Sequence, residues 1–273
     1  MSEPDTRGKV RLVFIVGPLR TGSSLTSRCL DDHPRAICLC ESEISHALFP
    51  PFKTRLHFDR MEAHGLGPRE IVGLLDGKRQ GVVPDMVRWY ADALPILKHR
   101  LATPQPLVLA DKSPDLDVAP GAVEAIAPRY HLVYTVRNPR AILRSIWRDD
   151  TPESEKLKRW AAFKRNVSNW APHWDRPNLL VSRYEDLVRT PEAAMRAIYS
   201  HCGLEWSDRF MDGFERLFPR RFLWTTAIDW ETGVRRAFDP AKAEVRDEDL
   251  GDVERGLLKG DAQVAAFCER FGY

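Results

Sequence analysis

The sequence predicts an α/β fold, a three-layer sandwich with a central parallel sheet, a phosphate-binding loop of the P-loop type and a helical insertion. Short apolar runs rich in β-branched residues alternate with stretches of helical periodicity, which is the pattern of a parallel sheet with crossover helices. The first such run, Leu12–Val16, leads into the glycine- and hydroxyl-rich stretch Gly17–Ser24. The 273 residues fit a single domain, taken as 1–273.

The expected elements follow in order along the chain. The first strand is read as buried on both faces because its apolar run is continuous, and His33-Pro34 ends the helix after it. Asn138 and Pro139 suit the N-cap and first turn of another helix. Strands are expected at 10–16, 36–40, 107–110, 131–136 and 178–182, and helices at 23–32, 119–127, 139–148, 153–173, 191–202, 207–216 and 246–271.

Three other segments are set apart by their composition. Residues 1–9 are expected to be a tail, and prolines punctuate amphipathic stretches over about 49–106, which predicts a helical cap insertion. Such a cap either contacts substrate or only packs, and both interpretations stay open. Residues 219–273 are expected to form a loop, to about 245, and then a helix that packs on the sheet. In the helix at 153–173, an apolar stripe predicts core rather than ligand stacking: Trp160, Phe163, Val167, Trp170 and Trp174.

Composition excludes several classes of protein. A net charge of +2 does not suit a polycation that binds nucleic acid. Five cysteines, without metal-binding spacing, indicate reduced thiols. The polar start has no apolar signal region, and the apolar runs are far shorter than the roughly 20 residues of a membrane span. We therefore expect a cytoplasmic protein without a membrane span.

The loop at Gly17–Ser24 has the glycine spacing of a nucleotide-binding P-loop, yet Ser23 stands where that loop carries lysine. Backbone N–H groups at the start of a helix point at an anion, and the helix dipole favours negative charge there. The loop is therefore predicted to bind phosphate, but not the γ-phosphate of ATP or GTP in the usual way.

Charged residues follow three further strands of the predicted sheet. Glu41 and Glu43 follow the second strand, Asp111-Lys112 the third, and Arg137 the fourth. The carboxyl ends of parallel strands open on one edge, where ligands bind. A carboxylate, a lysine and an arginine are thus expected around the phosphate-binding loop.

Four segments, within about residues 10–205, resemble sulfotransferases that use 3′-phosphoadenosine 5′-phosphosulfate (PAPS). Arg20-Thr21-Gly22-Ser23-Ser24-Leu25 is similar to the family's Arg-Ser-Gly-Thr-Thr-Leu loop, and Arg137 with Ser145 is similar to its second signature. Segments 111–114 and 182–187 also look like family segments. His33-Pro34 followed by Glu41 resembles the branch that includes tyrosylprotein sulfotransferases.

The resemblance implies a role for each of these residues. PAPS would be the cosubstrate and 3′-phosphoadenosine 5′-phosphate (PAP) the product, with no metal required. Glu41 would be the general base and Lys112 the cation at the leaving phosphate, while Glu43 and His46 are rivals for the base. Tyr184 would contact the nucleotide, or it is simply a packed core tyrosine. The loop residues Arg20, Thr21, Gly22, Ser23 and Ser24 would hold the 5′-phosphosulfate, and Arg137 and Ser145 the 3′-phosphate.

The missing lysine makes sense for this donor. A phosphosulfate has one 5′-phosphate and a sulfuryl group, so it carries less charge than a triphosphate bridged by Mg²⁺. Loop amides, the hydroxyls of Thr21, Ser23 and Ser24, and the Arg20 guanidinium could hold it without a lysine in the loop.

The sequence departs from the family pattern in two places. Leu39-Cys40 replaces the small or acidic residues expected before the base, and the donor loop near the end matches only weakly, through Thr225, Thr226, Arg235 and Arg236. Neither a Golgi anchor nor disulfides are evident, so secretory tyrosine sulfation is not implied. The acceptor, a small molecule or a biopolymer with a hydroxyl or amine, stays open, as does a homodimer.

Two other functions compete with sulfuryl transfer. A P-loop kinase for small molecules needs Mg²⁺, a loop lysine and an acidic residue at a strand end, and only the last has a candidate, in Asp111. A non-catalytic nucleotide-binding protein needs no base, which argues against it while Arg20, Glu41, Lys112 and Arg137 are all present.

Substitution Glu41→Gln tests the base. Because general base catalysis contributes roughly a hundredfold or more, turnover should fall by at least about that factor while PAP still binds. Steady-state kinetics and PAP titration measure the two effects. Full activity in this variant would remove Glu41 from the mechanism.

Overall fold

The computed structural model of the chain describes residues 11–40, 108–113, 116, 121–128, 130–148, 150–212 and 238–273. The tail at 1–9, the insertion at about 49–106 and the loop from 219 to 237 lie outside these residues. The interpretations placed on them therefore stay predictions.

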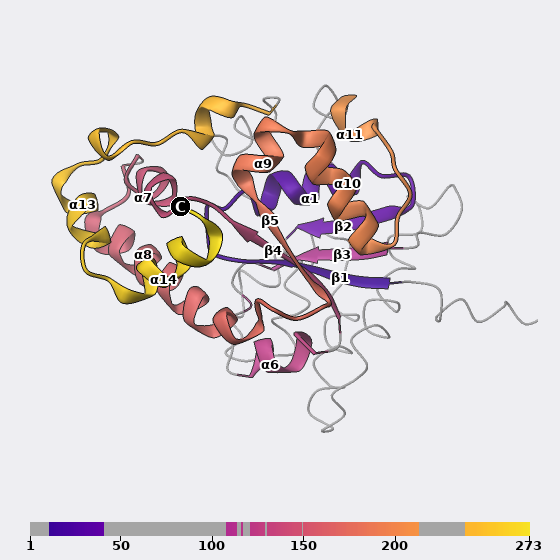
Figure 1. The fold of residues 1–273 in the computed structure, drawn as a ribbon, viewed down its shortest axis with the longest axis horizontal. Coiled ribbons are helices and arrows are strands. Elements are labelled where there is room, and N and C mark those ends of the chain that lie inside the picture. The colour runs from indigo at the N-terminus through magenta and orange to yellow at the C-terminus, as the bar shows by residue number, and fades with distance from the viewer. Residues whose placement is uncertain are drawn as a thin grey trace, which may run out of the picture.

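A parallel sheet forms the centre of the described structure (Figure 1). Its five strands lie in the order β2-β3-β1-β4-β5, and every neighbouring pair is parallel. All five agree with the predicted strands to within two residues: β1 Arg11–Val16, β2 Ala36–Cys40, β3 Val108–Lys112, β4 His131–Val136 and β5 Leu179–Arg183. The predicted parallel α/β class is confirmed.

Helices cover both faces of this sheet. Leu12, Phe14 and Val16 of β1 join one apolar cluster, while Val13 and Ile15 join another on the opposite face. The alternation arises because successive side chains of a strand point to opposite faces. The first cluster includes α7 (Pro139–Trp147), α8 (Glu153–Trp170) and α14 (Ala262–Phe271), and the second α1 (Ser23–Asp31), α9 (Tyr184–Arg189) and α10 (Pro191–Cys202). The three predicted layers are therefore present.

The apolar stripe of α8 is core, as its spacing predicted. Trp160, Phe163, Val167 and Trp170 are buried, and the Trp160 and Phe163 rings stack with centroids 4.5 Å apart. The ring of Phe163 also meets Phe267 of α14 edge-on at 5.5 Å. The stripe is thus used to attach α8 and α14 to the sheet.

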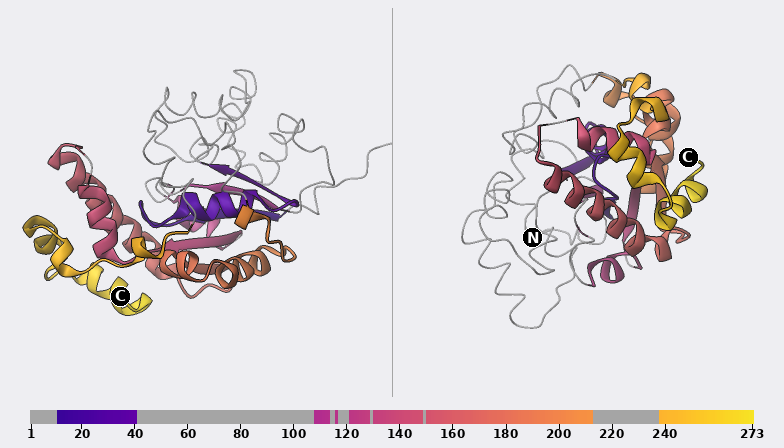
Figure 2. Two further views of the ribbon diagram at one scale, coloured as in Figure 1. Left: turned by 90° about the horizontal axis from the view of Figure 1, so that it is seen from above. Right: turned by 90° about the vertical axis from the view of Figure 1, so that its left-hand side faces the viewer.

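The single helix predicted over 246–271 is wrong. The structure has a 3₁₀ turn (η8, Asp247–Asp249), α13 (Asp252–Leu258) and then α14. Gly260 adopts a left-handed φ of 73°, and the Asp261 carboxylate caps α14 by accepting hydrogen bonds from the backbone N–H groups of Gln263 and Val264. These two residues end one helix and begin the next. Figure 2 shows α13 and α14, in yellow, beside α7 and α8.

Other boundaries differ from the predictions by smaller amounts. The helix predicted at 153–173 ends at Trp170 and continues as the 3₁₀ turn η4 (Ala171–His173), which contains Pro172. Within the described residues, α6 covers Ala122–Ile126 and α11 Arg209–Asp212. The loop predicted to reach 245 contains a 3₁₀ turn, η7 (Pro240–Ala243). The short helix α9, directly after β5, was not predicted.

Cysteines and helix lengths can be examined in the described residues. Cys29, Cys202 and Cys268 are free, and burial raises the pKa of the Cys202 thiol to about 12. In the described ranges, none of the helices combines the length and the apolar character that crossing a bilayer requires. The cytoplasmic location stays a prediction.

The register of the sheet brings the predicted strand ends to one edge. Lys112, the last residue of β3, pairs with Ile15 of β1 and with Cys40 of β2. Val136, the last residue of β4, pairs with Arg183 of β5. Chain connections diverge on either side of β1, so the loop after β1 lies at the switch point where parallel sheets bind ligands.

Candidate functional site

The loop between β1 and α1 depends on glycines at its two ends. Gly17 has a φ of 132° and Gly22 a φ of 87°, both in the range that favours glycine. A Cβ at Gly17 would come within 2.4 Å of the Thr135 carbonyl oxygen on β4. The sharp turn at the end of β1 therefore requires a residue without a side chain.

A pair of threonine hydroxyls holds the loop in shape. The Thr21 hydroxyl lies 2.7 Å from both the Pro18 carbonyl and the Thr135 hydroxyl, and Thr135 also reaches the Val16 carbonyl at 3.2 Å. Because Thr21 is almost fully buried, its hydroxyl is used inside the loop and supports the loop's shape. Sequence reasoning missed Thr135, although a lone threonine in an apolar strand was the available signal.

The start of α1 is arranged to receive an anion. Its N-cap is Gly22, which offers no side-chain acceptor, and its first turn contains no acidic residue. The first N–H groups of a helix lack intrahelical partners, and the helix dipole adds positive potential there. Ser23 and Ser24 open this turn, as predicted, so a phosphate or sulfate group would meet backbone amides and hydroxyls together.

A lysine from the neighbouring strand reaches this turn. Lys112 Nζ donates a hydrogen bond to Ser24 Oγ at 3.0 Å, and the Lys112 side chain is buried. The P-loop lysine that Ser23 replaces is thus compensated in space by a lysine at the end of β3. The structure brings the predicted loop and the predicted catalytic cation into direct contact.

Arg137, at the end of β4, connects the loop to a second segment. Its Nη1 donates to the Arg20 carbonyl at 3.1 Å, and its Nη2 to the Lys242 carbonyl of η7 at 2.7 Å. Among the described residues, its buried Nε has no hydrogen-bond partner. Burial lowers the pKa of this guanidinium, and nearby Arg20 lowers it further, while Tyr184 and Glu185 oppose the shift. An anion at this position would offset the unfavourable burial of the charge.

Tyr184 lies between Arg137 and the loop. The Arg137 guanidinium lies over the tyrosine ring, 4.2 Å from its centroid, and a Cβ at Gly22 would come within 2.4 Å of Tyr184 Cδ2. Burial raises the pKa of the Tyr184 hydroxyl, so the side chain is neutral. Tyr184 therefore packs in the core and also supports both anion-binding parts, while a direct contact with nucleotide stays a prediction.

Arg20 and Ser145 meet on the side of α7. Arg20 is exposed, has a φ of 68° and reaches the Ser145 carbonyl through Nη2 at 3.4 Å. Its guanidinium therefore extends toward α7, where the 3′-phosphate residues were predicted. Ser145 is half-buried on α7.

Glu41, Glu43 and His46 lie outside the described residues, as do Thr225, Thr226, Arg235 and Arg236. Cys40, which precedes Glu41 in the sequence, pairs with Lys112. The described part of the site is therefore the anion-binding half, with the cations Arg20, Lys112 and Arg137 around the start of α1.

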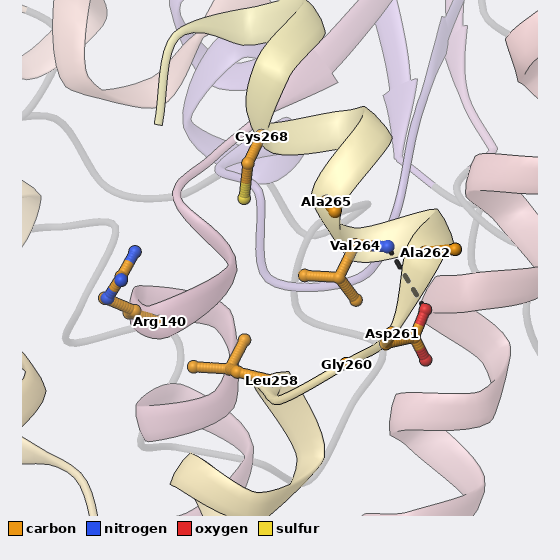
Figure 3. A pocket seen from close by; sticks show the side chains of 8 residues that line it. All are labelled: Arg140, Leu258, Gly260, Asp261, Ala262, Val264, Ala265 and Cys268. Atoms are coloured by element: carbon orange, nitrogen blue, oxygen red, sulfur yellow. Dashed lines mark hydrogen bonds between the residues drawn. The ribbon is translucent and has the colours of Figure 1, made fainter.

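A cavity of about 300 Å³ lies elsewhere, between α7 and the helices α13 and α14 (Figure 3). Its lining is mostly aliphatic, with Leu258, Val264 and Cys268 facing Arg140. None of the predicted site residues lines it. We therefore place the functional site at the strand ends and not in this cavity.

The sheet order, the glycine-rich turn and the clustered cations define an α/β protein of the P-loop type whose switch point is suited to anionic groups. A model of the Sulfotransferase family matches residues 13–208, which include most of β1, all of β2–β5 and every described residue of the predicted site. The chain belongs to the sulfotransferase family, whose reaction is sulfuryl transfer, and the predicted family and reaction are confirmed.

Two curated relatives agree with this assignment. Protein-tyrosine sulfotransferase 2 of Gallus gallus is 22% identical over 272 residues, with 96% of this chain and 69% of the relative covered. Protein-tyrosine sulfotransferase of Drosophila melanogaster is also 22% identical, over 271 residues. That alignment covers 96% of this chain but only 51% of the relative.

Solved structures show the same fold. The sulfotransferase domain of the olefin synthase from Synechococcus PCC 7002 superposes with a TM-score of 0.64 at 20% identity, and covers 100% of this chain and 98% of that one. The sulfotransferase domain from the curacin biosynthetic pathway gives 0.56 at 17% identity, with 97% and 98% covered. At these identities the likeness supports the fold alone.

Substitution Gly22→Ala tests the contact between the loop and Tyr184. In this variant the residue is strained by the left-handed φ, and its Cβ also clashes with the Tyr184 ring. The free energy of unfolding should therefore fall by about 1–3 kcal/mol more than in a variant that is strained by the φ alone. Gly121→Ala is the matched control, since Gly121 has a φ of 74° and open space around its Cβ position. Urea unfolding measures both; equal losses would show that the ring contact does not constrain the loop.

Proposed function

We propose that the chain takes PAPS as its sulfuryl donor. The start of α1 with Lys112 would hold the 5′-phosphosulfate, and Arg137 with Ser145 the 3′-phosphate. This proposal is supported by two separate anion-binding places at one sheet edge. An ordinary nucleotide with phosphates only at the 5′ position would use one of them.

The observation that carries the proposal is the state of Arg137. Its side chain is half-buried, its two terminal nitrogens donate hydrogen bonds to carbonyl oxygens, and its buried Nε lacks a hydrogen-bond partner among the described residues. Carbonyls supply partial charge, whereas a phosphate would supply a full counter-charge and charge-assisted hydrogen bonds. A second phosphate near Arg137 would account for a half-buried arginine with a buried, unpartnered Nε in this position.

The proposed reaction is an in-line displacement at sulfur. The acceptor oxygen or nitrogen forms the new bond to sulfur while the bond from sulfur to the oxygen of the 5′-phosphate breaks. Glu41 takes the acceptor's proton, and Lys112 stabilises the negative charge that develops on the departing phosphate oxygen. No metal is required in this scheme, because the cations are supplied by the protein.

The acceptor is a hydroxyl or an amine of a small molecule or a biopolymer. Two relatives carry the name protein-tyrosine sulfotransferase, so a tyrosine phenol is a reasonable first acceptor to test. Sugars, lipids and bacterial natural products are the other acceptor classes. A net charge of +2 still gives no reason to expect nucleic acid as a partner.

The kinase alternative is less well supported. Asp111, its candidate Mg²⁺ ligand, is fully buried, and its Oδ2 accepts a hydrogen bond from Ser113 Oγ at 3.1 Å. Arg137, which the kinase scheme does not use, is in place at the end of β4, the strand that pairs with β1.

Thermal shift separates the two donors. A ligand at a hundred times its Kd stabilises the folded state by about 2.7 kcal/mol. For a chain of this size that should raise Tm by roughly 5 °C or more. We expect this shift with PAP, without added metal, and a smaller one with AMP or ATP–Mg²⁺. A larger shift with ATP–Mg²⁺ than with PAP would favour the kinase.

Substitution Arg137→Ala tests the 3′-phosphate. Loss of a charge-assisted contact should weaken PAP binding roughly ten- to a hundredfold and leave AMP binding nearly unchanged. Arg144→Ala is the control, because Arg144 lies on α7, the helix that follows Arg137, but pairs with Asp249 at 3.4 Å. Calorimetric titration measures both ligands, and an equal loss for PAP and AMP would contradict the assignment.

A further inference from the structure

A buried carboxylate outside the predicted site lies directly behind Arg137. Glu185 follows Tyr184 in the first turn of α9 and is only 4% exposed. Its Oε1 accepts a hydrogen bond from the Asn138 backbone N–H at 2.9 Å, and its Oε2 accepts one from the Tyr273 hydroxyl at 2.8 Å. A buried carboxylate needs such partners, so this arrangement is specific.

The bond to Asn138 fixes the connection from β4 to α7. Asn138 N belongs to the peptide group that joins Arg137 to Asn138, and this group is planar. Holding its N–H therefore limits the direction in which Arg137 leaves the strand. On the other side, the Asn138 side chain caps α7 by accepting from the Arg140 backbone N–H at 2.9 Å. The turn at Asn138 thus fixes both the direction of Arg137 and the start of α7, the helix that carries Ser145.

Tyr273 holds the carboxylate from behind. Its ring stacks on Phe267 of α14 with centroids 6.1 Å apart, and the Arg183 guanidinium lies 4.8 Å from its centroid. Burial, reinforced by the Glu185 carboxylate, raises the pKa of the Tyr273 hydroxyl, so it stays protonated and can donate. The residues after α13 are in this way joined to the donor site.

Two physical roles for Glu185 can be separated. Its negative charge helps to keep Arg137 protonated, but the same charge would repel a 3′-phosphate nearby. Its oxygens, in contrast, favour binding of the 3′-phosphate only indirectly, because the hydrogen bond to Asn138 holds the Arg137–Asn138 peptide group in place. Since repulsion opposes the ligand, the hydrogen bonds and not the charge explain a carboxylate in this position.

We propose that Glu185, held by Tyr273, is a positioning residue for Arg137 and thereby sets the preference of the site for 3′-phosphorylated nucleotides. The inference rests on the proposed function, because it assigns the 3′-phosphate to Arg137. It adds two residues, Glu185 and Tyr273, that act through Arg137 and need not touch the donor.

The test compares the affinities of PAP and AMP by calorimetric titration, expressed as the dissociation constant of AMP divided by that of PAP. Glu185→Ala leaves the Asn138 N–H and the Tyr273 hydroxyl without their acceptor and should lower the ratio about tenfold, through PAP alone. Glu185→Gln keeps an acceptor oxygen for Asn138 and should stay within about threefold of the wild type. Tyr273→Phe removes only the second bond and should lower the ratio by about threefold.

The matched control is Glu254→Ala. Glu254 is also a buried carboxylate at a helix start, and its Oε2 accepts from the Gly251 backbone N–H at 2.6 Å, but it does not contact the turn at Arg137–Asn138. Its removal should leave the ratio unchanged. Tm is measured for every variant, and if Glu185→Ala does not fold, Tyr273→Phe and Glu185→Gln decide the question.

Each other outcome has a definite meaning. A wild-type ratio in Glu185→Ala, or in Tyr273→Phe if Glu185→Ala does not fold, overturns the proposal. So does a loss in Glu254→Ala as large as that in Glu185→Ala, which would indicate general destabilisation. An equal loss in Glu185→Gln and Glu185→Ala would assign the effect to charge and also overturn it. A wild-type protein that does not prefer PAP over AMP would instead refute the proposed function before any variant is compared.

Discussion

The arrangement of the site depends on the contact of the Arg137 guanidinium with the Tyr184 ring. This one contact brings together the end of β4, the start of α9 and, through the Arg20 and Lys242 carbonyls, the loop after β1 and the turn η7. A guanidinium suits this position because it is planar, so it can lie on an aromatic ring while its edges donate hydrogen bonds. Displacement of any of these segments would move the others.

The loop after β1 illustrates how a charge can be supplied from a distance in sequence. Its local sequence places Ser23 where a P-loop has lysine, which by itself suggests a weakened phosphate site. In the folded chain, Lys112 Nζ lies 3.0 Å from Ser24 Oγ, so a cation is present beside the helix start after all. The parallel register of β1 and β3 brings the two together, because Ile15 and Lys112 are paired residues. The loop is therefore complete only as part of the sheet.

The proposed anion-binding site rests on buried groups whose polar atoms are largely paired. Thr21 and Thr135 use their hydroxyls to close the loop, and Glu185 accepts two hydrogen bonds at the turn beyond β4. Groups held in this way do not need to reorganise when a ligand arrives, which is the advantage of a preorganised site. The proposed 3′-phosphate assignment and the proposed role of Glu185 both draw on this pattern, in which most side chains hold the backbone and few would face the ligand.

The sequence by itself determined the sheet, the phosphate-binding loop and the family, because these depend on local patterns: continuous apolar runs, glycines at turns and short signatures at strand ends. Glu41 was also named from the sequence alone. Only the tertiary structure decided that Lys112 reaches Ser24, that Thr135 closes the loop and that Glu185 and Tyr273 lie behind Arg137. The hydrogen bonds Lys112–Ser24, Thr135–Thr21 and Tyr273–Glu185 each join residues that are 88 or more positions apart. No local pattern encodes such a distance. The break at Gly260-Asp261 was missed for the opposite reason, since the helical periodicity on both sides concealed a short local signal.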